Sequence, residues 1–311
     1  MHLVRRIIDV RNWRSKCVEK TVGFVPTMGA LHRGHLSLVR SARSECEFVA
    51  ATIFVNPTQF GAGEDLSKYP RNEKSDIELL KNEGVDLIFV PNTQELYPKE
   101  DRFSVIPPSN FTQRAEATAR PTHFAGVATI CTKLFNIVQP SYAYFGQKDA
   151  LQCVAMKQLV ADLNIPINIR ICPTERESDG LALSSRNTYL SPSERKAAPV
   201  VYKGLLAARH TWRQLSSSQQ EPISASILIE AARNIYQAEP LVSSVEYISV
   251  SDFDSMIDLE FVPAASSSSF RTFSTGICDD DNSFLSLPRS IISVALRIGQ
   301  VRLIDNLPLR E

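Results

Sequence analysis

The sequence predicts an α/β fold, in which a parallel sheet carries helices on both faces and a smaller α+β domain follows. Through the first half of the chain, short apolar runs alternate with segments of helical periodicity. The run Phe48–Val55 (FVAATIFV) is almost wholly apolar, as in a strand buried on both faces of a sheet. Strands that alternate with helices in this way favour a parallel sheet covered by helices.

The strands and helices of this sheet follow one another in a regular order. Each strand is a short apolar run bounded by polar residues, Gly or Pro, and each helix shows apolar residues spaced three or four apart. Strands are predicted at Thr21–Val25, Phe48–Val55, Val85–Val90, Tyr142–Phe145 and Ile165–Cys172. Helices are predicted at His35–Glu45, Asn72–Asn82, Gly126–Val138 and Ala150–Leu163.

The second half of the chain has a different composition. Nineteen serines lie within residues 216–293, against nine within residues 1–160. We expect two domains, 1–175 with the parallel sheet and 176–311 with the smaller α+β fold, and a Ser-rich insertion near 263–289. The elements predicted in the smaller domain are a helix at Ile223–Tyr236 and strands at Val245–Val250, Ser290–Arg297 and Val301–Ile304.

The composition excludes several classes of protein. The 34 Lys and Arg balance the 34 Asp and Glu, whereas a protein that binds duplex DNA needs a basic face. No apolar run reaches the roughly 18 to 20 residues that span a bilayer. Six scattered cysteines indicate reduced thiols and a cytoplasmic protein. The Arg-rich start leaves a transit peptide as the alternative, which Asp9 and the early folded pattern disfavour.

The segment Pro26–His35 (PTMGALHRGH) is the sharpest local feature. It follows a strand and opens a helix, where unpaired N–H groups and the helix dipole favour phosphate. Gly29 and Gly34 allow the backbone to approach a ligand closely. His32 and His35 lie three residues apart, and each can donate a hydrogen bond to a phosphoryl oxygen. A zinc site without an evident third ligand, or two structural histidines in a turn, are the alternatives.

Two further segments carry groups that suit phosphate. Lys148 in Phe145–Asp149 (FGQKD) stands where a predicted strand ends and a helix begins, so it can pair with a phosphate. Ser178–Asn187 (SDGLALSSRN) holds two hydroxyls and a guanidinium in sequence, which can grip a triphosphate. Taken alone, each segment is more typical of a solvated turn or a polar interdomain loop than of a phosphate site.

Other polar side chains suit a second substrate. Gln59 in Asn56–Phe60 (NPTQF) follows a buried strand, and its amide can bind a hydroxyl or a carboxylate. Gln152 lies on a later helix and can face the same cleft. Arg120 and His123 precede an apolar helix and can reach phosphates. A structural role for each glutamine and a surface role for the Arg–His pair remain alternatives.

Together these motifs resemble the H-x-G-H nucleotidyltransferase superfamily and, more narrowly, the pantoate–β-alanine ligase (pantothenate synthetase) family. The resemblance covers residues 21–190 and 301–306, in the family's order. It is carried by PTMGALHRGH, NPTQF, EDLSKYP, RPTHFAGVATICTKLFNIVQP, YFGQKD, DGLALSSRN and VRLIDN. Residues 214–290 match weakly, and the Ser-rich stretch resembles an insertion of the eukaryotic, fungal-like form. The resemblance implies a Rossmann-like domain that binds ATP and pantoate, with the smaller domain acting as a lid.

The resemblance also implies roles for individual residues. His35 would be the residue that the family treats as a general acid, and His32 and Lys148 would be catalytic beside it. Gln59 and Gln152 would hold pantoate. ATP would be bound by Met28, Gly29, Ala30, Leu31, His32, Arg33, Gly34, His35, Gly146, Gln147, Lys148, Asp149, Glu175, Leu183, Ser184, Ser185 and Arg186. No residue is assigned to a metal.

The implied reaction is an ATP-dependent condensation of pantoate with β-alanine through pantoyl-adenylate, which releases pyrophosphate and AMP. ATP as substrate, Mg²⁺, small-molecule partners and a homodimer are implied as well, without nucleic acid or membrane. Two other functions stay open, another H-x-G-H nucleotidyltransferase and a nucleotide-binding protein that has lost catalysis. Intact His32, His35, Lys148 and Arg186 disfavour the second of these.

Overall fold

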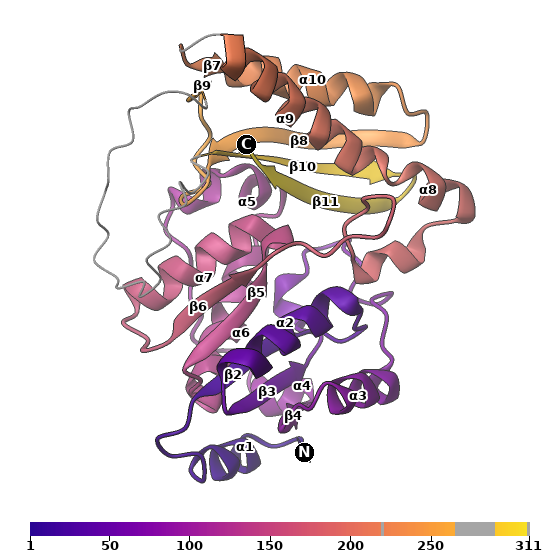
Figure 1. The fold of residues 1–311 in the computed structure, drawn as a ribbon. Helices are drawn as coiled ribbons and strands as arrows, with labels where there is room; N and C mark the ends of the chain where they lie inside the picture. The colour runs from indigo at the N-terminus through magenta and orange to yellow at the C-terminus, as the bar shows by residue number, and fades with distance from the viewer. Residues whose placement is uncertain (219–220, 265–289, 310–311) are drawn as a thin grey trace. The chain divides into compact units, whose positions relative to one another are not determined.

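The computed structural model describes residues 1–218, 221–264 and 290–309. Within these ranges, a parallel six-stranded sheet dominates the first part of the chain (Figure 1). Its strands lie in the order β1 (His2–Val4), β4 (Leu87–Phe89), β3 (Phe48–Ile53), β2 (Val22–Thr27), β5 (Tyr142–Gly146) and β6 (Asn168–Cys172). The predicted α/β fold is therefore confirmed, and its five predicted strands correspond to β2 to β6. The short edge strand β1 was not predicted.

Helices connect the strands and cover both faces of the sheet. The longer ones are α1 (Ile7–Arg14), α2 (Arg33–Glu45), α3 (Glu73–Asn82), α6 (His123–Val138) and α7 (Ala150–Asp162). Short turns of helix lie between them: η1 (Pro57–Gln59), α4 (Thr93–Leu96), η2 (Phe111–Gln113), α5 (Ala115–Ala119), η3 (Gln147–Asp149) and η4 (Ser185–Tyr189). Helices α2 and α6 begin two and three residues before their predicted starts.

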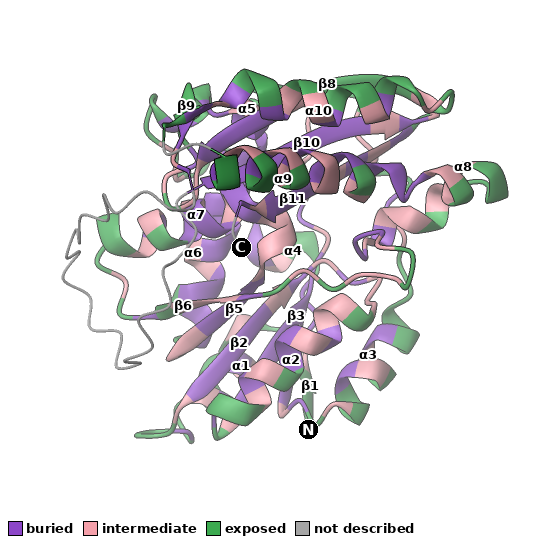
Figure 2. Cartoon of the chain, turned by 45° about the horizontal axis from the view of Figure 1, so that its top comes forward, coloured by how far each residue is buried: buried purple, intermediate pink, exposed green. Residues whose placement is uncertain are grey.

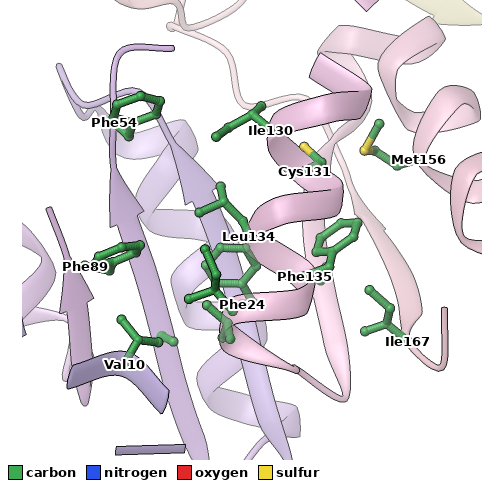
Figure 3. Packing of buried hydrophobic residues seen from close by; sticks show 14 of the residues in the cluster. Val10, Phe24, Phe54, Phe89, Ile130, Cys131, Leu134, Phe135, Met156 and Ile167 are labelled. Carbon is green, nitrogen blue, oxygen red and sulfur yellow. The ribbon is translucent and has the colours of Figure 1, made fainter. Parts of the chain in front are cut away.

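Alternate residues of the strands pack into two separate cores, one on each face of the sheet. Phe24 of β2 packs with Phe135 of α6 on one face, where α1 and α7 add further apolar side chains (Figure 3). Val25, the next residue of β2, packs against α2 and α3 on the other face. The central strands are buried while the outer sides of α2 and α3 are exposed (Figure 2). This two-sided burial explains why the strand sequences are apolar throughout.

The strand order creates a switch point between β2 and β5. From β2 the chain builds β3 and β4 on one side, and it then returns to place β5 and β6 on the other side. Phe24 of β2 accordingly has Ala50 of β3 on one side and Ala143 of β5 on the other. In sheets of this kind, ligands bind in the crevice at the carboxyl ends of the strands beside such a point.

The chain divides into two compact units, Met1–Arg195 and Lys196–Glu311. The boundary expected from the sequence lies twenty residues earlier, after residue 175. Residues 176–195 belong to the first unit because a bridge joins Arg176 to Ala182 and the Ser185 hydroxyl donates to Ala30 O. Most of the Ser-rich stretch near 263–289 lies outside the described residues.

The second unit pairs helices with an antiparallel sheet, as predicted. Its sheet has the order β11 (Val301–Pro308), β10 (Ser290–Ile298), β8 (Val242–Asp252), and β7 (Ile223–Ser224) pairs with β9 (Phe261–Val262). Helices α9 (Val200–Ser218) and α10 (Ala225–Gln237) pack together, and the Tyr236 hydroxyl donates to Val201 O over 3.0 Å. Helix α9 was not predicted. The short helix α8 (Pro192–Ala197) crosses the boundary between the units.

Candidate active site

A pocket opens at the carboxyl ends of β2, β3 and β5, at the switch point of the sheet. Its walls come from the segments that follow those strands and from the loop before η4. All of its lining residues belong to the unit Met1–Arg195. The predicted site residues on its wall are Met28, His32, Gly34, His35, Gln59, Gly146, Lys148, Asp149, Gln152, Glu175, Leu183, Ser184, Ser185 and Arg186.

Five residues predicted to bind ATP do not line this pocket. Arg33 points away from it, since its exposed side chain pairs with Glu177 over 2.7 Å. Three of the others form the loop before α2, and Gln147 lies in η3. The five are Gly29, Ala30, Leu31, Arg33 and Gln147.

His32 and His35 cap the start of α2 reciprocally. The Nδ1 atom of His32 accepts from the Gly34 N–H at 3.2 Å, and the Nδ1 atom of His35 accepts from the His32 N–H at 3.3 Å. Their ring centroids are 4.1 Å apart. Because a neutral imidazole has one proton, each ring must carry it on Nε2. Each ring therefore stabilises the helix through its Nδ1 atom and keeps an N–H donor at Nε2.

Both rings stay uncharged near neutral pH. Burial, with the neighbouring His35 and Lys148, lowers the pKa of His32 to about 3. Burial and the Lys148 charge lower the pKa of His35 to about 4. Each side chain is enclosed by protein yet keeps part of its surface in the pocket. The arrangement suits a pair of neutral hydrogen-bond donors rather than a pair of cations.

The loop before α2 is held by a buried carboxylate. Asp76 of α3 is 2% exposed, and its two oxygens accept from the N–H groups of Ala30 and Leu31, each over 2.8 Å. Gly29 has φ +81°, and a Cβ there would lie 2.9 Å from Asp76 Oδ2. The loop thus needs glycine at this position. The amides of Ala30, Leu31, His32 and Gly34 already have acceptors, so the prediction that unpaired amides receive phosphate does not apply to these four.

Arg186 meets a carboxylate in the structure. Its Nε and Nη2 atoms donate to the two oxygens of Asp65, each over 2.9 Å. Burial opposes the charge of Arg186, but the hydrogen bonds to Asp65 outweigh it and raise the pKa of the guanidinium. Ser185 donates to Ala30 O over 2.9 Å, and Ser184 accepts from the Arg186 N–H. The loop that was predicted to grip phosphate is thereby tied to the loop before α2.

A further cation on the pocket wall is Lys148 in η3. Its Nζ lies 3.6 Å from Asp149 Oδ2, and its side chain is mostly buried. Glu175 is exposed at the rim, with its carbonyl accepting from the Leu183 N–H over 2.9 Å.

Gln59 and His123 also line the pocket. The Arg120 guanidinium donates to His123 Nε2 at 3.1 Å and binds both oxygens of Glu64, over 2.6 and 2.9 Å. His123 Nδ1 donates to Gln59 O over 2.9 Å. Burial, followed by the charge of Arg120, lowers the pKa of His123 to about 4. The Arg–His pair therefore lines the pocket, as one of its two sequence interpretations allowed.

Sequence reasoning missed several residues that hold this site in place. Asp76 lies in a helical pattern rich in charges, so nothing distinguished it from the solvent-exposed residues around it. Asp65 lies in the EDLSKYP motif, but that motif did not indicate a partner for Arg186. The hydrogen bonds of Asp76 and Asp65 join residues that are close in space but distant in sequence, so the sequence alone does not indicate them.

The described residues contain no group of three or more His, Cys, Asp or Glu side chains arranged to hold a metal ion. The carboxylates on the pocket wall are those of Asp149 and Glu175. Both Nδ1 atoms of the paired histidines are already used by the backbone, which leaves little basis for the zinc alternative.

The family model of pantoate-beta-alanine ligase matches residues 2–308. The chain belongs to this family. Membership makes it an enzyme of the ligase class. Segments from several of the motifs described above also meet on the walls of one pocket.

Individual relatives agree with the family model. The pantothenate synthetase of Chloroflexus aggregans is 44% identical over 306 residues, which cover 98% of this chain and 99% of the relative. The crystal structure of pantothenate synthetase from Thermus thermophilus is similar with a TM-score of 0.84 and 38% identity, over 100% of each chain. A pantoate-beta-alanine ligase from Francisella tularensis, complexed with beta-gamma ATP and beta-alanine, matches with a TM-score of 0.73 and 31% identity, over 99% of this chain and 98% of that one.

These relatives are bacterial, so they do not support the expectation of a eukaryotic, fungal-like form. The Ser-rich composition on which that expectation depended is a feature of this chain. It does not identify the lineage, because polar insertions are tolerated on the surfaces of many proteins.

Proposed function

We propose that this chain condenses pantoate with β-alanine at the expense of ATP, through a pantoyl-adenylate. The observation that carries the proposal is the pocket at the switch point. There the paired histidines, Lys148 and Arg186 line the same cavity as Gln59, so that groups suited to phosphate and groups suited to a hydroxyl or a carboxylate share one pocket. This arrangement allows a carboxylate to meet the α-phosphorus of ATP.

The first half-reaction needs alignment and charge neutralisation more than proton transfer. Pantoate is ionised near neutral pH, because carboxyl pKa values lie at about 4. Its carboxylate oxygen attacks the α-phosphorus, and pyrophosphate leaves. Gln59 and Gln152 hold pantoate in this proposal, and neither is asked to act as a base.

We assign His32 and His35 the role of neutral donors. Their Nε2–H groups can contact the phosphoryl oxygens on which charge develops during adenylate formation. This differs from the general-acid role that the resemblance implied for His35, because a neutral imidazole does not release its remaining proton near pH 7. Lys148 supplies the positive charge beside them.

Arg186 and the adjacent serines complete the phosphate side of the proposal. Asp65 accepts from the Nε and Nη2 atoms of Arg186, so the two protons of Nη1 and the second proton of Nη2 are left for phosphate oxygens. Asp65 then acts as the group that orients the guanidinium. Ser184, Ser185 and Leu183 form the loop that passes over the phosphates, and Glu175 lies beside the adenine.

Mg²⁺ is proposed to enter with the triphosphate. The donor set fits this, because Mg²⁺ keeps several waters and phosphate oxygens and needs only one or two carboxylates. Asp149, next to Lys148 on the pocket wall, is the carboxylate placed to hold it. When bound, the ion would neutralise charge on the phosphates.

The partners proposed are small molecules, namely ATP, pantoate and β-alanine, together with a second copy of the chain in a homodimer. Sedimentation at equilibrium would test the dimer. No helix in the described part of the chain is long and apolar enough to cross a membrane. The proposed compartment is the cytoplasm. The free, buried state of the five described cysteines supports it, because reduced thiols are typical of that compartment.

The decisive experiment combines the protein with ATP, Mg²⁺, D-pantoate and β-alanine, and measures AMP and the amide product. Formation of both in equal amounts is expected. A transfer of adenylate to a phosphate acceptor, without the amide, would favour the alternative H-x-G-H nucleotidyltransferase. ATP binding without release of AMP would favour a protein that has lost catalysis.

A further inference from the structure

Behind the wall that carries Gln59 lies a buried hydrogen-bond network, named here the Asn56 network. It consists of the side chains of Asn56, Thr58, Gln59 and Tyr97 with the carbonyl of Gly126. Asn56 is 1% exposed, and Gln59 and Tyr97 are also buried. Tyr97 follows α4 and does not line the pocket, whereas Asn56 and Gln59 do.

The direction of the hydrogen bonds in this network follows from one acceptor. Gly126 O is a carbonyl and can only accept, so the amide group that lies 3.3 Å from it must be Asn56 Nδ2. The Oδ1 atom of Asn56 then faces the hydroxyls of Tyr97 and Thr58, which donate to it over 2.9 and 3.0 Å. The backbone next to Gly126 is fixed, since a Cβ there would lie 2.3 Å from Thr58 O.

The orientation of Gln59 follows in turn. The second proton of Asn56 Nδ2 is donated to Gln59 Oε1 over 3.0 Å. The carbonyl end of the Gln59 amide is thus used by the protein, and its Nε2 end remains for the pocket. A ligand that meets Gln59 meets a donor, which suits a carboxylate or a hydroxyl oxygen.

We propose that Tyr97 is a positioning residue for the pantoate site, which it controls by fixing Asn56 and thereby the donor end of Gln59. The inference rests on the proposed function for the identity of the ligand. Burial raises the pKa of Tyr97 despite the Thr58 hydrogen bond, so the phenol remains a donor at any working pH. Its hydroxyl lies 3.3 Å from Thr58 Oγ1, and the two hydroxyls share one acceptor.

The test uses Tyr97→Phe, which removes one hydroxyl and keeps the ring on which the side chains of Arg102 and Lys133 lie. We expect the pantoate KM to rise roughly three- to tenfold, as for one lost hydrogen bond, while the ATP KM stays within about twofold. Equal rises in both KM values, or no rise in the pantoate KM, would overturn the proposal. Tyr236→Phe is the matched control, because it also removes a buried tyrosine hydroxyl with a carbonyl partner. It should leave the pantoate KM unchanged.

A double-mutant cycle separates positioning from general loosening. Thr58→Val alone leaves Tyr97 as a donor to Asn56, and Tyr97→Phe alone leaves Thr58. The double variant leaves Asn56 Oδ1 without either donor, so the effect on the pantoate KM should exceed the product of the single effects by about threefold or more. A purely multiplicative result would contradict a shared role.

Calorimetric titration of pantoate, with α,β-methylene ATP present, distinguishes this proposal from the proposed function. If the wild type binds pantoate in this titration but forms no AMP in the assay with ATP, the proposed function fails. The effect of Tyr97→Phe on the pantoate Kd then still decides the role of Tyr97. If turnover is normal and the variant binds pantoate as tightly as the wild type, the role of Tyr97 fails alone. No binding of pantoate to the wild type would overturn both.

Discussion

His32 and His35 each serve the fold and the pocket with the same ring. Reciprocal capping uses the Nδ1 atoms, and it satisfies two N–H groups that the start of a helix otherwise leaves unpaired. The Nε2 protons are left for a ligand. Because both roles reside in one side chain, a substitution that removes the whole ring removes the cap as well, and the two effects must be separated by choice of substituent.

We expect His35→Ala to reduce pyrophosphate release by about 100- to 1,000-fold, the typical cost of a lost transition-state donor. It should also lower the free energy of unfolding by about 1 kcal/mol through loss of the cap. His35→Gln is the matched control, since glutamine at this helix position can accept from the N-cap amide. It should restore stability, measured by urea unfolding, and any rate that it recovers reports the donor of its own amide. A rate of pyrophosphate release by His35→Ala that is close to that of the wild type would show that the histidine is purely structural.

Stability should depend on pH through three histidines. His32, His35 and His123 have pKa values of about 3, 4 and 4 in the folded protein, against about 6.5 when unfolded. As pH falls below 6.5, the unfolded chain takes up protons that the folded chain refuses, so the free energy of unfolding falls until about pH 4. Each group contributes up to roughly 1.4 kcal/mol per pH unit.

Urea unfolding at pH 7.5, 6.5 and 5.5 measures this slope. Carboxylates contribute little above pH 5.5, so histidine titration dominates this range. His123→Gln keeps a donor and an acceptor but cannot titrate, and its slope should be smaller than that of the wild type by up to one proton. An identical slope would show that His123 has the same pKa in the folded and the unfolded protein.

At the scale of elements, α3 acts as a clamp for the loop that precedes α2. Asp76 accepts both loop amides from a site that is closed to solvent. A buried carboxylate is costly unless charge-assisted hydrogen bonds surround it, and here two such bonds do so. The loop is therefore held in one conformation before any ligand arrives.

We expect Asp76→Asn to lower the free energy of unfolding by about 1 to 3 kcal/mol, because one of the two amides would face an N–H group instead of an oxygen. The ATP KM should rise as the loop loses its fixed geometry. Glu78→Gln on the exposed side of the same helix is the control, and it should change stability by less than about 0.5 kcal/mol. If the two substitutions behave alike, Asp76 does not act as a clamp.

The parts of the fold that could be predicted are those in which a run of one type of residue indicates the structure. Apolar runs such as Phe48–Ile53 identify strands, and the Pro26–His35 motif supplies residues that line the pocket. Asp76 and Tyr97 could not be found in this way, because a carboxylate in a helix and a tyrosine after a short turn acquire their roles only from partners distant in sequence. The helix α9 (Val200–Ser218) was missed although its buried residues Val201, Leu205, Ala208 and Trp212 are spaced three or four apart, as helical periodicity requires.

At the scale of the whole molecule, the switch point brings groups from three strand ends to one cavity. The carboxylate must meet the phosphorus first, and the amine is needed only afterwards, so the reaction should run in two separable halves. With ATP, Mg²⁺ and pantoate alone, we expect about one pyrophosphate per active site, followed by a stall. Enclosure of the adenylate should protect it from water until the amine arrives.

Quenched-flow counting of pyrophosphate without β-alanine tests this order, followed by amide formation when β-alanine is added. Omission of pantoate is the control and should give no pyrophosphate. If pyrophosphate appears only with β-alanine present, all three substrates must assemble before the first bond breaks, and the adenylate-first order is wrong.

The reciprocal cap also limits how protons travel in this enzyme. An imidazole relays a proton by taking one up at one nitrogen as it gives one away at the other, and here the lone pair of each ring is already engaged by a backbone amide. Neither histidine is then a ready base for the ammonium group of β-alanine, whose pKa is about 10 by analogy with lysine. We therefore expect the amine to lose its proton to a group other than these two rings, such as a water molecule. The rate of amide formation should then rise with pH, because the neutral amine is the form that attacks.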